Sequence, residues 1–151
     1  MIERTLVLVK PDGIKRSLTG TVISKFENAG LKIVGMRMVW VNKSLSKKHY
    51  SDHIGKPFFP GLDEFIRSGP VLAMVLEGVE AIKNVRRIVG STAPSEATPG
   101  TIRGDYAHHS YAYADRAGKS IANIIHASGD AKDAKKEVSL WFDKKELHSY
   151  K

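Results

Sequence analysis

Several features are absent from this 151-residue sequence, and each absence excludes a class of protein. It has no cysteine, which excludes a disulfide framework and a thiolate metal site. No apolar run approaches the roughly 20 residues that a membrane helix needs, so we expect no membrane partner. The first apolar stretch is too short, and its flank too acidic, for a signal peptide. A cytoplasmic location is the expectation that follows.

Acidic residues are also few, with 16 Asp and Glu against 24 Lys and Arg, which gives a net charge of +8. This excess favours polyanionic ligands such as nucleotides, nucleic acid or acidic membranes. The basic residues are spread along the chain, so a solvated basic surface explains them equally well. A hydrophobic content of 42% without repeats fits one domain over residues 1–151.

The apolar pattern predicts four strands and several helices. The strands are expected at residues 5–9, 34–40, 71–76 and 123–126, with Gly35 marking a bulge. Helical spacing predicts helices near residues 22–29, 59–66, 79–89 and 130–141. A turn is expected at residues 10–13. Ser44 is expected to cap a short helix that carries His49 and Tyr50, and Asp130 to cap the last helix.

This element order predicts an α+β protein of the ferredoxin-like βαββαβ kind. We expect a four-stranded antiparallel sheet with helices on one face. A doubly wound parallel sheet is the alternative, although its Gly-rich phosphate-binding signatures are missing. Residues 90–122 have no sustained apolar period and are expected to form a long loop. Loops of that length in a compact domain are uncommon and usually functional.

His126 is the leading candidate for chemistry, because it ends a predicted strand and has a carboxylate within reach. Glu137 follows eleven positions later, on a helix that can fold back beneath the strand. It would then hold one ring nitrogen and leave the other free as a nucleophile. The alternative is a surface histidine and an exposed helix charge.

Phosphate-binding candidates are Arg86, Arg87 and Arg103, since guanidinium groups match phosphate oxygens bidentately. Thr92 would add a hydroxyl. Lys10 stands at the end of the first strand, where open sheets place ligand contacts. Each of these residues, taken singly, fits a surface position equally well.

Aromatic residues provide candidates for base stacking. Phe58 would stack on a nucleobase if it lies exposed in a cleft, or would belong to the core. Tyrosines and histidines at residues 106–113 resemble a base-stacking loop for RNA only weakly. The remaining histidines have no carboxylate at recognisable spacing, so we expect no zinc site: His49, His53, His108, His109 and His148.

Taken together, the motifs resemble those of the nucleoside diphosphate kinase family over nearly the whole chain. Seven segments in the right order make this resemblance specific, and it continues to Glu137 and Trp141. The segments are residues 3–5 (ERT), 10–13 (KPDG), 49–50 (HY), 56–62 (KPFFPGL), 68–70 (SGP), 99–105 (PGTIRGD) and 123–128 (NIIHAS).

The resemblance implies a role for each matching residue. It implies that His126 is phosphorylated and dephosphorylated in turn, as γ-phosphate passes from a nucleoside triphosphate to a nucleoside diphosphate with low base specificity. Glu137 and Ser128 would orient His126. Phe58 would stack on the base. The implied contacts to the phosphates, the reacting centre and the sugar are Lys10, Tyr50, Arg86, Thr92, Arg103 and Asn123.

The resemblance also implies Mg²⁺ bridging the nucleotide phosphates, with no direct protein ligand. It implies a homo-oligomer, with a hexamer favoured and a tetramer possible. A nucleic-acid-binding protein on the same fold is the alternative, motivated by the net charge. A scaffold that has lost catalysis would require a missing catalytic residue, and none of those mapped is missing.

The sequence departs from the family pattern in two places. Gly129 stands where an aspartate is common. The link between Asp105 and Asn123 is longer than usual by roughly ten residues, which makes it a candidate for a special role. We expect residues 106–122 to make contacts between subunits, because tyrosines favour interfaces. A lid over the nucleotide is the competing hypothesis.

Overall fold

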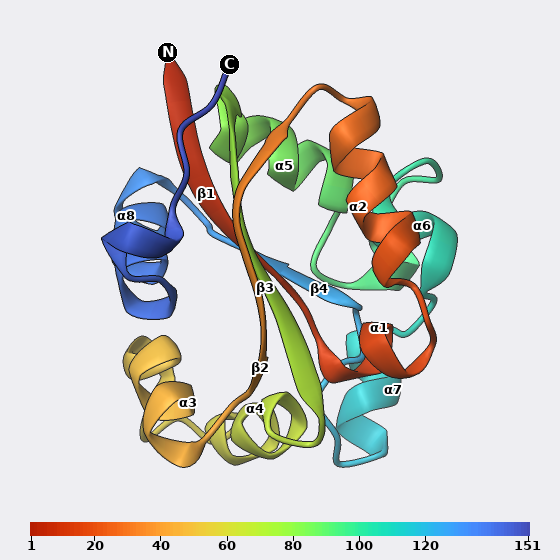
Figure 1. Ribbon diagram of the computed structural model, residues 1–151. Coiled ribbons are helices and arrows are strands. Elements are labelled where there is room, and N and C mark those ends of the chain that lie inside the picture. Colours follow the sequence, from red (N-terminus) through yellow and green to blue (C-terminus); the bar gives the residue numbers. More distant parts are fainter.

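The computed structural model describes residues 1–151 and shows one four-stranded sheet surrounded by helices (Figure 1). No helix combines the length and the apolar character that crossing a bilayer requires. Short 3₁₀ turns lie at Ser51–His53, Pro94–Glu96 and Lys144–Glu146. The strands and α-helices, in chain order, are β1 (Ile2–Val9), α1 (Pro11–Lys15), α2 (Thr19–Asn28), β2 (Lys32–Trp40), α3 (Lys43–His49), α4 (Phe59–Ile66), β3 (Pro70–Val79), α5 (Ala81–Val89), α6 (Ile102–Tyr106), α7 (Tyr111–Arg116), β4 (Ile125–Ala127) and α8 (Ala131–Trp141).

The sheet has the strand order β2-β3-β1-β4, and every neighbouring pair is antiparallel. This arrangement confirms the ferredoxin-like prediction and excludes the doubly wound alternative. The expected bulge is present, as a register shift between Ile33 and Gly35. A Cβ atom at Gly35 would lie 2.8 Å from the Leu147 side chain, so close packing of the C-terminal segment explains the glycine.

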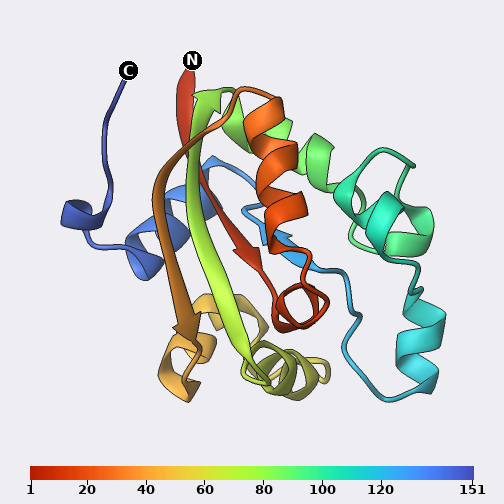
Figure 2. The same ribbon diagram turned by 45° about the vertical axis from the view of Figure 1, so that its right-hand side comes forward.

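Helices cover both faces of the sheet, so the expectation of helices on one face is wrong (Figure 2). Val7 and Val9 of β1 pack with α2 and α5 on one side. Leu6 and Leu8 pack on the other side, where Trp141 of α8 joins them. Unbroken apolar runs are typical of strands covered on both faces. His126, the catalytic candidate on β4, contacts the α8 side of the sheet through Glu137.

Residues 90–122 are not the loop that we expected, because they contain α6 and α7 and a 3₁₀ turn. The side chain of Thr101 caps α6 by accepting a hydrogen bond from the Gly104 backbone, and Ser110 caps α7 in the same way. Such caps satisfy backbone N–H groups that a short helix leaves free. A small core of Ala93, Ala114 and Ile121 fixes α7 to the rest of the segment.

Two local expectations at helix starts are also wrong. A short helix, α1, replaces the turn expected at residues 10–13, and Pro11 occupies its first position, where proline is well tolerated. Asn42, rather than Ser44, caps α3. Asp130 caps α8 as predicted, by accepting a hydrogen bond from the Asp133 backbone. A Cβ at Gly129 would lie 2.8 Å from the Asp133 carboxylate, at the flexible end of that side chain.

Candidate functional site

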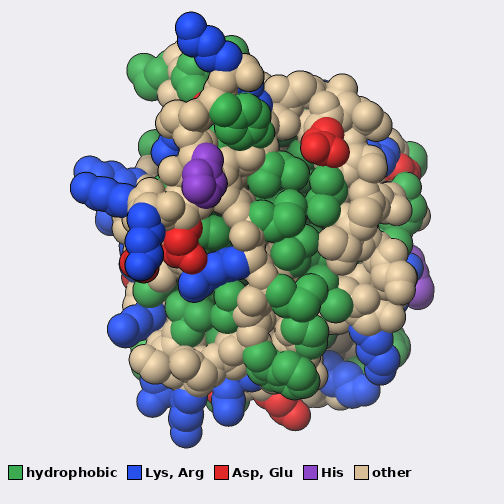
Figure 3. Space-filling view, in the orientation of Figure 1, with side chains coloured by type: hydrophobic (Ala, Val, Ile, Leu, Met, Phe, Trp, Pro, Cys, Tyr) green, Lys and Arg blue, Asp and Glu red, His purple; other side chains and the backbone are tan.

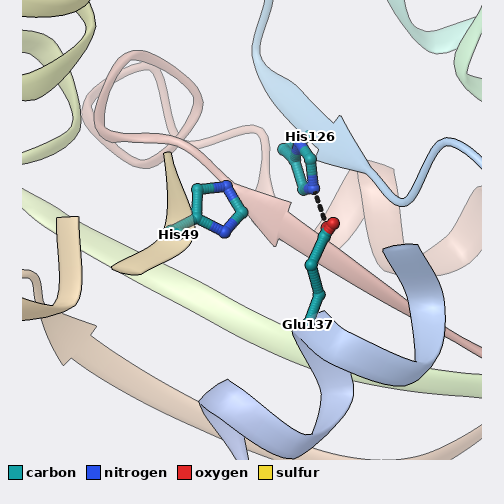
Figure 4. A group of neighbouring side chains, drawn as sticks. All are labelled: His49, His126 and Glu137. Atoms are coloured by element: carbon teal, nitrogen blue, oxygen red, sulfur yellow. Dashed lines mark hydrogen bonds and ion pairs between the residues drawn. The ribbon is translucent and has the colours of Figure 1, made fainter. Parts of the chain in front are cut away.

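His126 is the middle residue of β4, and its ring is held from below by α8 (Figure 4). The ring Nε2 forms a hydrogen bond with the Glu137 carboxylate. The same carboxylate oxygen accepts a hydrogen bond from Ser128 Oγ at 3.3 Å. Ser128 is itself fixed, because its Oγ accepts the Leu6 backbone N–H at 3.3 Å. The three predicted partners therefore meet, and Nδ1 of the imidazole is left without a protein partner.

The electrostatic surroundings keep the His126 imidazole neutral. Burial lowers its pKa far below the ordinary value, and the nearby cations Lys10, Arg103 and Arg86 lower it further. Burial raises the pKa of Glu137. A neutral imidazole that donates from Nε2 carries a lone pair on Nδ1, which is the form that a nucleophile needs.

His49 is a neighbour of this group that the sequence interpretation missed. Its ring meets the ring of His126 edge-on, with centroids 4.7 Å apart, and Trp141 Nε1 donates to its Nδ1 at 3.2 Å. Burial is the main cause that lowers the His49 pKa to about 3, and the neighbouring His126 contributes to the same shift. Ligand atoms of His49, His126 and Glu137 lie within 4.8 Å of one another. The sequence spacing of His49 and Glu137 gave no sign of this proximity, which arises only in the folded chain.

Cationic side chains surround a cavity of about 150 Å³ that His126 also lines. Lys10, Arg86 and Arg103 come from the end of β1, from α5 and from α6. Thr92 lies at the rim and also lines a second, larger cavity. No carboxylate lines the smaller cavity. The arrangement suits an anion held beside a neutral imidazole.

Arg103 is fixed by the backbone that precedes His126. It donates to the carbonyl oxygens of Asn123 at 3.2 Å, Gly90 at 3.1 Å and Ile125 at 2.6 Å. A guanidinium group has five N–H donors, so further donors are left for a ligand. The three bonds give Arg103 a structural duty beside the predicted phosphate contact.

Ile124, which Arg103 brackets, has an unusual backbone conformation. Its φ of +73° is uncommon for a β-branched residue and carries strain. Its N–H donates to the Asp12 carboxylate at 2.9 Å, and its carbonyl accepts the Lys10 N–H at 2.8 Å. This conformation explains why β4 begins at Ile125, two residues later than predicted. It also fixes the chain just before His126.

Lys10 and Asn123 form a second fixed unit at the junction of the two cavities. Lys10 Nζ donates to Asn123 Oδ1 at 2.8 Å, and Asn123 Nδ2 donates to the Thr92 carbonyl at 2.9 Å. Burial and, to a lesser extent, the nearby Arg103 charge lower the pKa of Lys10 to about 8. Both side chains are buried yet line both cavities.

The larger cavity has a volume of about 730 Å³ and opens next to the smaller one. Phe58 lines it and is 52% exposed, so it is not a core residue. Lys10, Thr92 and Asn123 are shared by the two cavities. Together the cavities form one elongated site with a cationic end and an aromatic end, of the size that small-molecule sites have.

Two of the predicted contacts to the ligand lie away from these cavities. Tyr50 lines a third cavity, of about 150 Å³ between α3 and α8, on the Glu137 side of His126. Its ring packs against His49, and burial raises its pKa. Arg87 is exposed and lines none of the cavities described, unlike its neighbour Arg86.

Known proteins resemble this chain in sequence and in fold. Residues 3–147 match the family model described as nucleoside diphosphate kinase. The chain is 48% identical to a nucleoside diphosphate kinase of Pyrococcus furiosus, over 99% of this chain and 88% of that protein. The structure of a transition state mimic of the Borrelia burgdorferi enzyme, with bound vanadate and ADP, is 45% identical. It superposes with a TM-score of 0.96 and covers 99% of this chain and 92% of that one.

A second solved structure is that of a halophilic nucleoside diphosphate kinase from Halobacterium salinarum in complex with CDP. It is 42% identical, with a TM-score of 0.89, over 100% of this chain and 94% of that one. Close similarity to these relatives therefore extends over the whole fold, including the segments that carry both cavities.

Proposed function

This chain belongs to the nucleoside diphosphate kinase family and is a phosphotransferase for nucleotides; on that premise we propose that the phosphoryl group passes through Nδ1 of His126. One observation carries the proposal. Nε2 of His126 is engaged by Glu137, which leaves Nδ1 as the free nitrogen of a ring that lines the cationic cavity.

The reaction consists of two displacements at phosphorus. In the first, the Nδ1 lone pair forms a bond to the γ-phosphorus of a nucleoside triphosphate, and the bond to the β-phosphate oxygen breaks. The nucleoside diphosphate leaves with that electron pair. In the second, a terminal oxygen of another nucleoside diphosphate attacks the phosphorus, and the nitrogen–phosphorus bond breaks. Donor product leaves before acceptor binds, so the kinetics are ping-pong.

Lys10, Arg86 and Arg103 stabilise the charge on the transferring phosphoryl group in this proposal, and Thr92 adds a hydroxyl. Positioning and electrostatic stabilisation account for most of the catalysis of phosphoryl transfer. Glu137 stabilises the positive charge that develops on the ring as its Nδ1 bonds to phosphorus. Ser128 positions Glu137.

Mg²⁺ fits this site as an ion bound through the nucleotide. The cationic cavity has no carboxylate to ligate it, and magnesium binds phosphate oxygens and water readily. The ion would supply positive charge that offsets the charge of the nucleotide phosphates. Lys10, Arg86, Arg103 and Thr92 would then bind the remaining phosphate oxygens.

The nucleoside occupies the larger cavity. Lys10 and Asn123 are placed to bind the sugar, and the exposed ring of Phe58 offers a face on which any base can stack. Relatives bind ADP and CDP, which carry different bases, and this supports low base specificity. We assign Tyr50 a role at the reacting centre through the His49 ring, because it lies on the Glu137 side of His126.

We further propose that the protein is a homo-oligomer, with a hexamer favoured over a tetramer. A cytoplasmic location is also part of the proposal. The edge strand β2 supports association, because it exposes Met36, Met38 and Trp40. Hydrophobic side chains form a band over this part of the surface (Figure 3). Exposed apolar patches typically mark interaction sites. Light scattering of Met38→Glu should give a smaller mass than the wild-type protein.

The direct test uses γ-labelled ATP and Mg²⁺. The protein should acquire an acid-labile, alkali-stable label, and an added nucleoside diphosphate should remove it as labelled triphosphate. His126→Ala should lose labelling and transfer together. Retained transfer at the wild-type rate would contradict the proposal. Nucleic-acid affinity that survives His126→Ala with no labelling in the wild type would favour the alternative function.

A further inference from the structure

Helices α4 and α7 lie at the same end of the molecule (Figure 1), and residues of both line the larger cavity. Helix α7 forms one wall of this cavity. The cavity is lined by Tyr111, Ala114, Asp115 and Gly118. Tyr111, Ala114 and Asp115 lie three and four positions apart, so they share one face of α7, and Gly118 lies just beyond its end. The face is held in place, because Ala114 packs with Ala93 and Ile121.

The opposite wall is formed by the segment around Phe58. Pro57, Phe58, Gly61 and Leu62 line it. The two walls approach each other where a Cβ on Gly61 would lie 3.8 Å from the Ser120 backbone nitrogen. A base that stacks on Phe58 is therefore flanked by α7 and by the residues that follow it.

Asp115 and Lys119 are the charged groups on the wall formed by α7 and the residues that follow it. Both line the cavity, and both are exposed. Neither side chain forms an ion pair with another residue, although the chain has six such pairs elsewhere. Asp115 therefore has a free carboxylate acceptor, and Lys119 a free ammonium donor.

Guanine has the hydrogen-bonding groups that match this pair. Its N1–H and N2–H₂ groups donate, which suits a carboxylate, and its O6 accepts, which suits an ammonium. Adenine and cytosine each present one exocyclic amine donor, and uracil presents a single ring N–H between two acceptors. Guanine is thus the base with two adjacent donors beside an acceptor.

We propose that Asp115, with Lys119 beside it, makes the base end of this site favour guanine nucleotides over the other common ones. The inference rests on the proposed function, because it takes the larger cavity as the nucleoside site. Stacking on Phe58 still admits every base, so the preference is graded rather than absolute. This placement also agrees with the lid hypothesis for residues 106–122; the contact between subunits stays a prediction.

The test measures nucleotide affinity by calorimetry, so that it does not depend on phosphoryl transfer. GDP should bind the wild-type protein about tenfold more tightly than ADP, CDP or UDP, the lower end of what one bidentate base contact gives. Asp115→Asn should lose that advantage and bind xanthosine diphosphate better than the wild type does. Xanthine has a carbonyl at C2, which accepts from an amide but not from a carboxylate.

Glu64→Gln is the matched control, since Glu64 is an exposed carboxylate of α4 that does not line the cavity. It should keep the wild-type order of affinities. Equal affinities for all four diphosphates in the wild type, or an unchanged order in Asp115→Asn, would overturn the inference. Phosphoenzyme formation, assayed separately with labelled ATP, would still stand in that case. Its loss would instead contradict the proposed function.

Discussion

The two ends of the site are built in different ways. At the cationic end, Lys10, Arg103 and Asn123 are buried and hydrogen-bonded to the protein, mostly to the segment just before His126. At the aromatic end, Phe58 and Tyr111 are about half exposed. The nearby Asp115 and Lys119 form no ion pair with other residues. Rigid placement suits a reaction at one phosphorus atom, whereas an open end accepts different bases. Substitutions should therefore affect stability at one end and affinity at the other.

The largest effect is expected for Arg103, because it both stabilises the backbone near His126 and is expected to bind phosphate. Arg103→Ala leaves three carbonyl acceptors without a partner and should lower the free energy of unfolding by about 3 kcal/mol. The ratio kcat/KM should also fall, by about a hundredfold or more. Urea unfolding and steady-state kinetics measure the two effects.

Arg86→Ala separates phosphate binding from stability, because Arg86 makes no hydrogen bond to the backbone just before His126. Its kcat/KM should fall about a hundredfold, with a stability change below about 0.5 kcal/mol. Arg87→Ala is the matched control on the same helix and should change neither quantity. A loss of activity in Arg87→Ala as large as in Arg86→Ala would contradict the placement of the cationic cavity.

The next effect is a pH dependence that arises at the cationic end alone. Burial lowers the Lys10 pKa to about 8, so a rise in pH through that value removes a charge that binds phosphate. The ratio kcat/KM, which reports the free enzyme, should fall about tenfold per pH unit above pH 8. In Lys10→Met this alkaline limb should vanish, at a lower overall activity. An unchanged limb in Lys10→Met would assign it to another group.

At the aromatic end the effect is expected in affinity alone. Phe58→Ala should weaken the binding of all nucleotides similarly, by about 1–3 kcal/mol, because the lost stacking does not depend on the base. Stability should change little, since the ring is half exposed. Tyr113→Ala is the control, an exposed ring of α7 that does not line the cavity. A fall in stability with unchanged affinity would mean that Phe58 packs as a core residue.

Much of the fold was predictable because the apolar period is strong in its long elements. The predicted helix at residues 59–66 matches α4, and Asp130 caps α8 as expected. The coverage of both sheet faces by helices was not predicted, although the unbroken apolar run in β1 indicates a strand buried on both faces. The short helices α6 and α7 were missed for a physical reason. Five or six residues are too few to show a period, and caps and local packing hold them.

The site residues could be predicted where the chemistry of the side chain itself indicates the role. His126, Glu137 and Ser128 meet as expected, and Lys10 and Asn123 are bonded to each other. The structural bonds of Arg103 depend on carbonyl groups up to 22 positions away, which no local pattern reveals. His49 reaches His126 only through the packing of α3 against β4 and α8. Asp115 was missed because α7 itself was missed.

The central claim is that Nδ1 of His126 carries the phosphoryl group, and the position of that bond can be measured directly. Phosphorus and nitrogen NMR of the phosphoprotein, prepared with ATP and kept at alkaline pH, distinguishes the two ring isomers. Since Glu137 engages Nε2, phosphorus should be bonded to Nδ1, with Nε2 still protonated. A phosphoryl group on Nε2, or on a residue other than His126, would contradict the account.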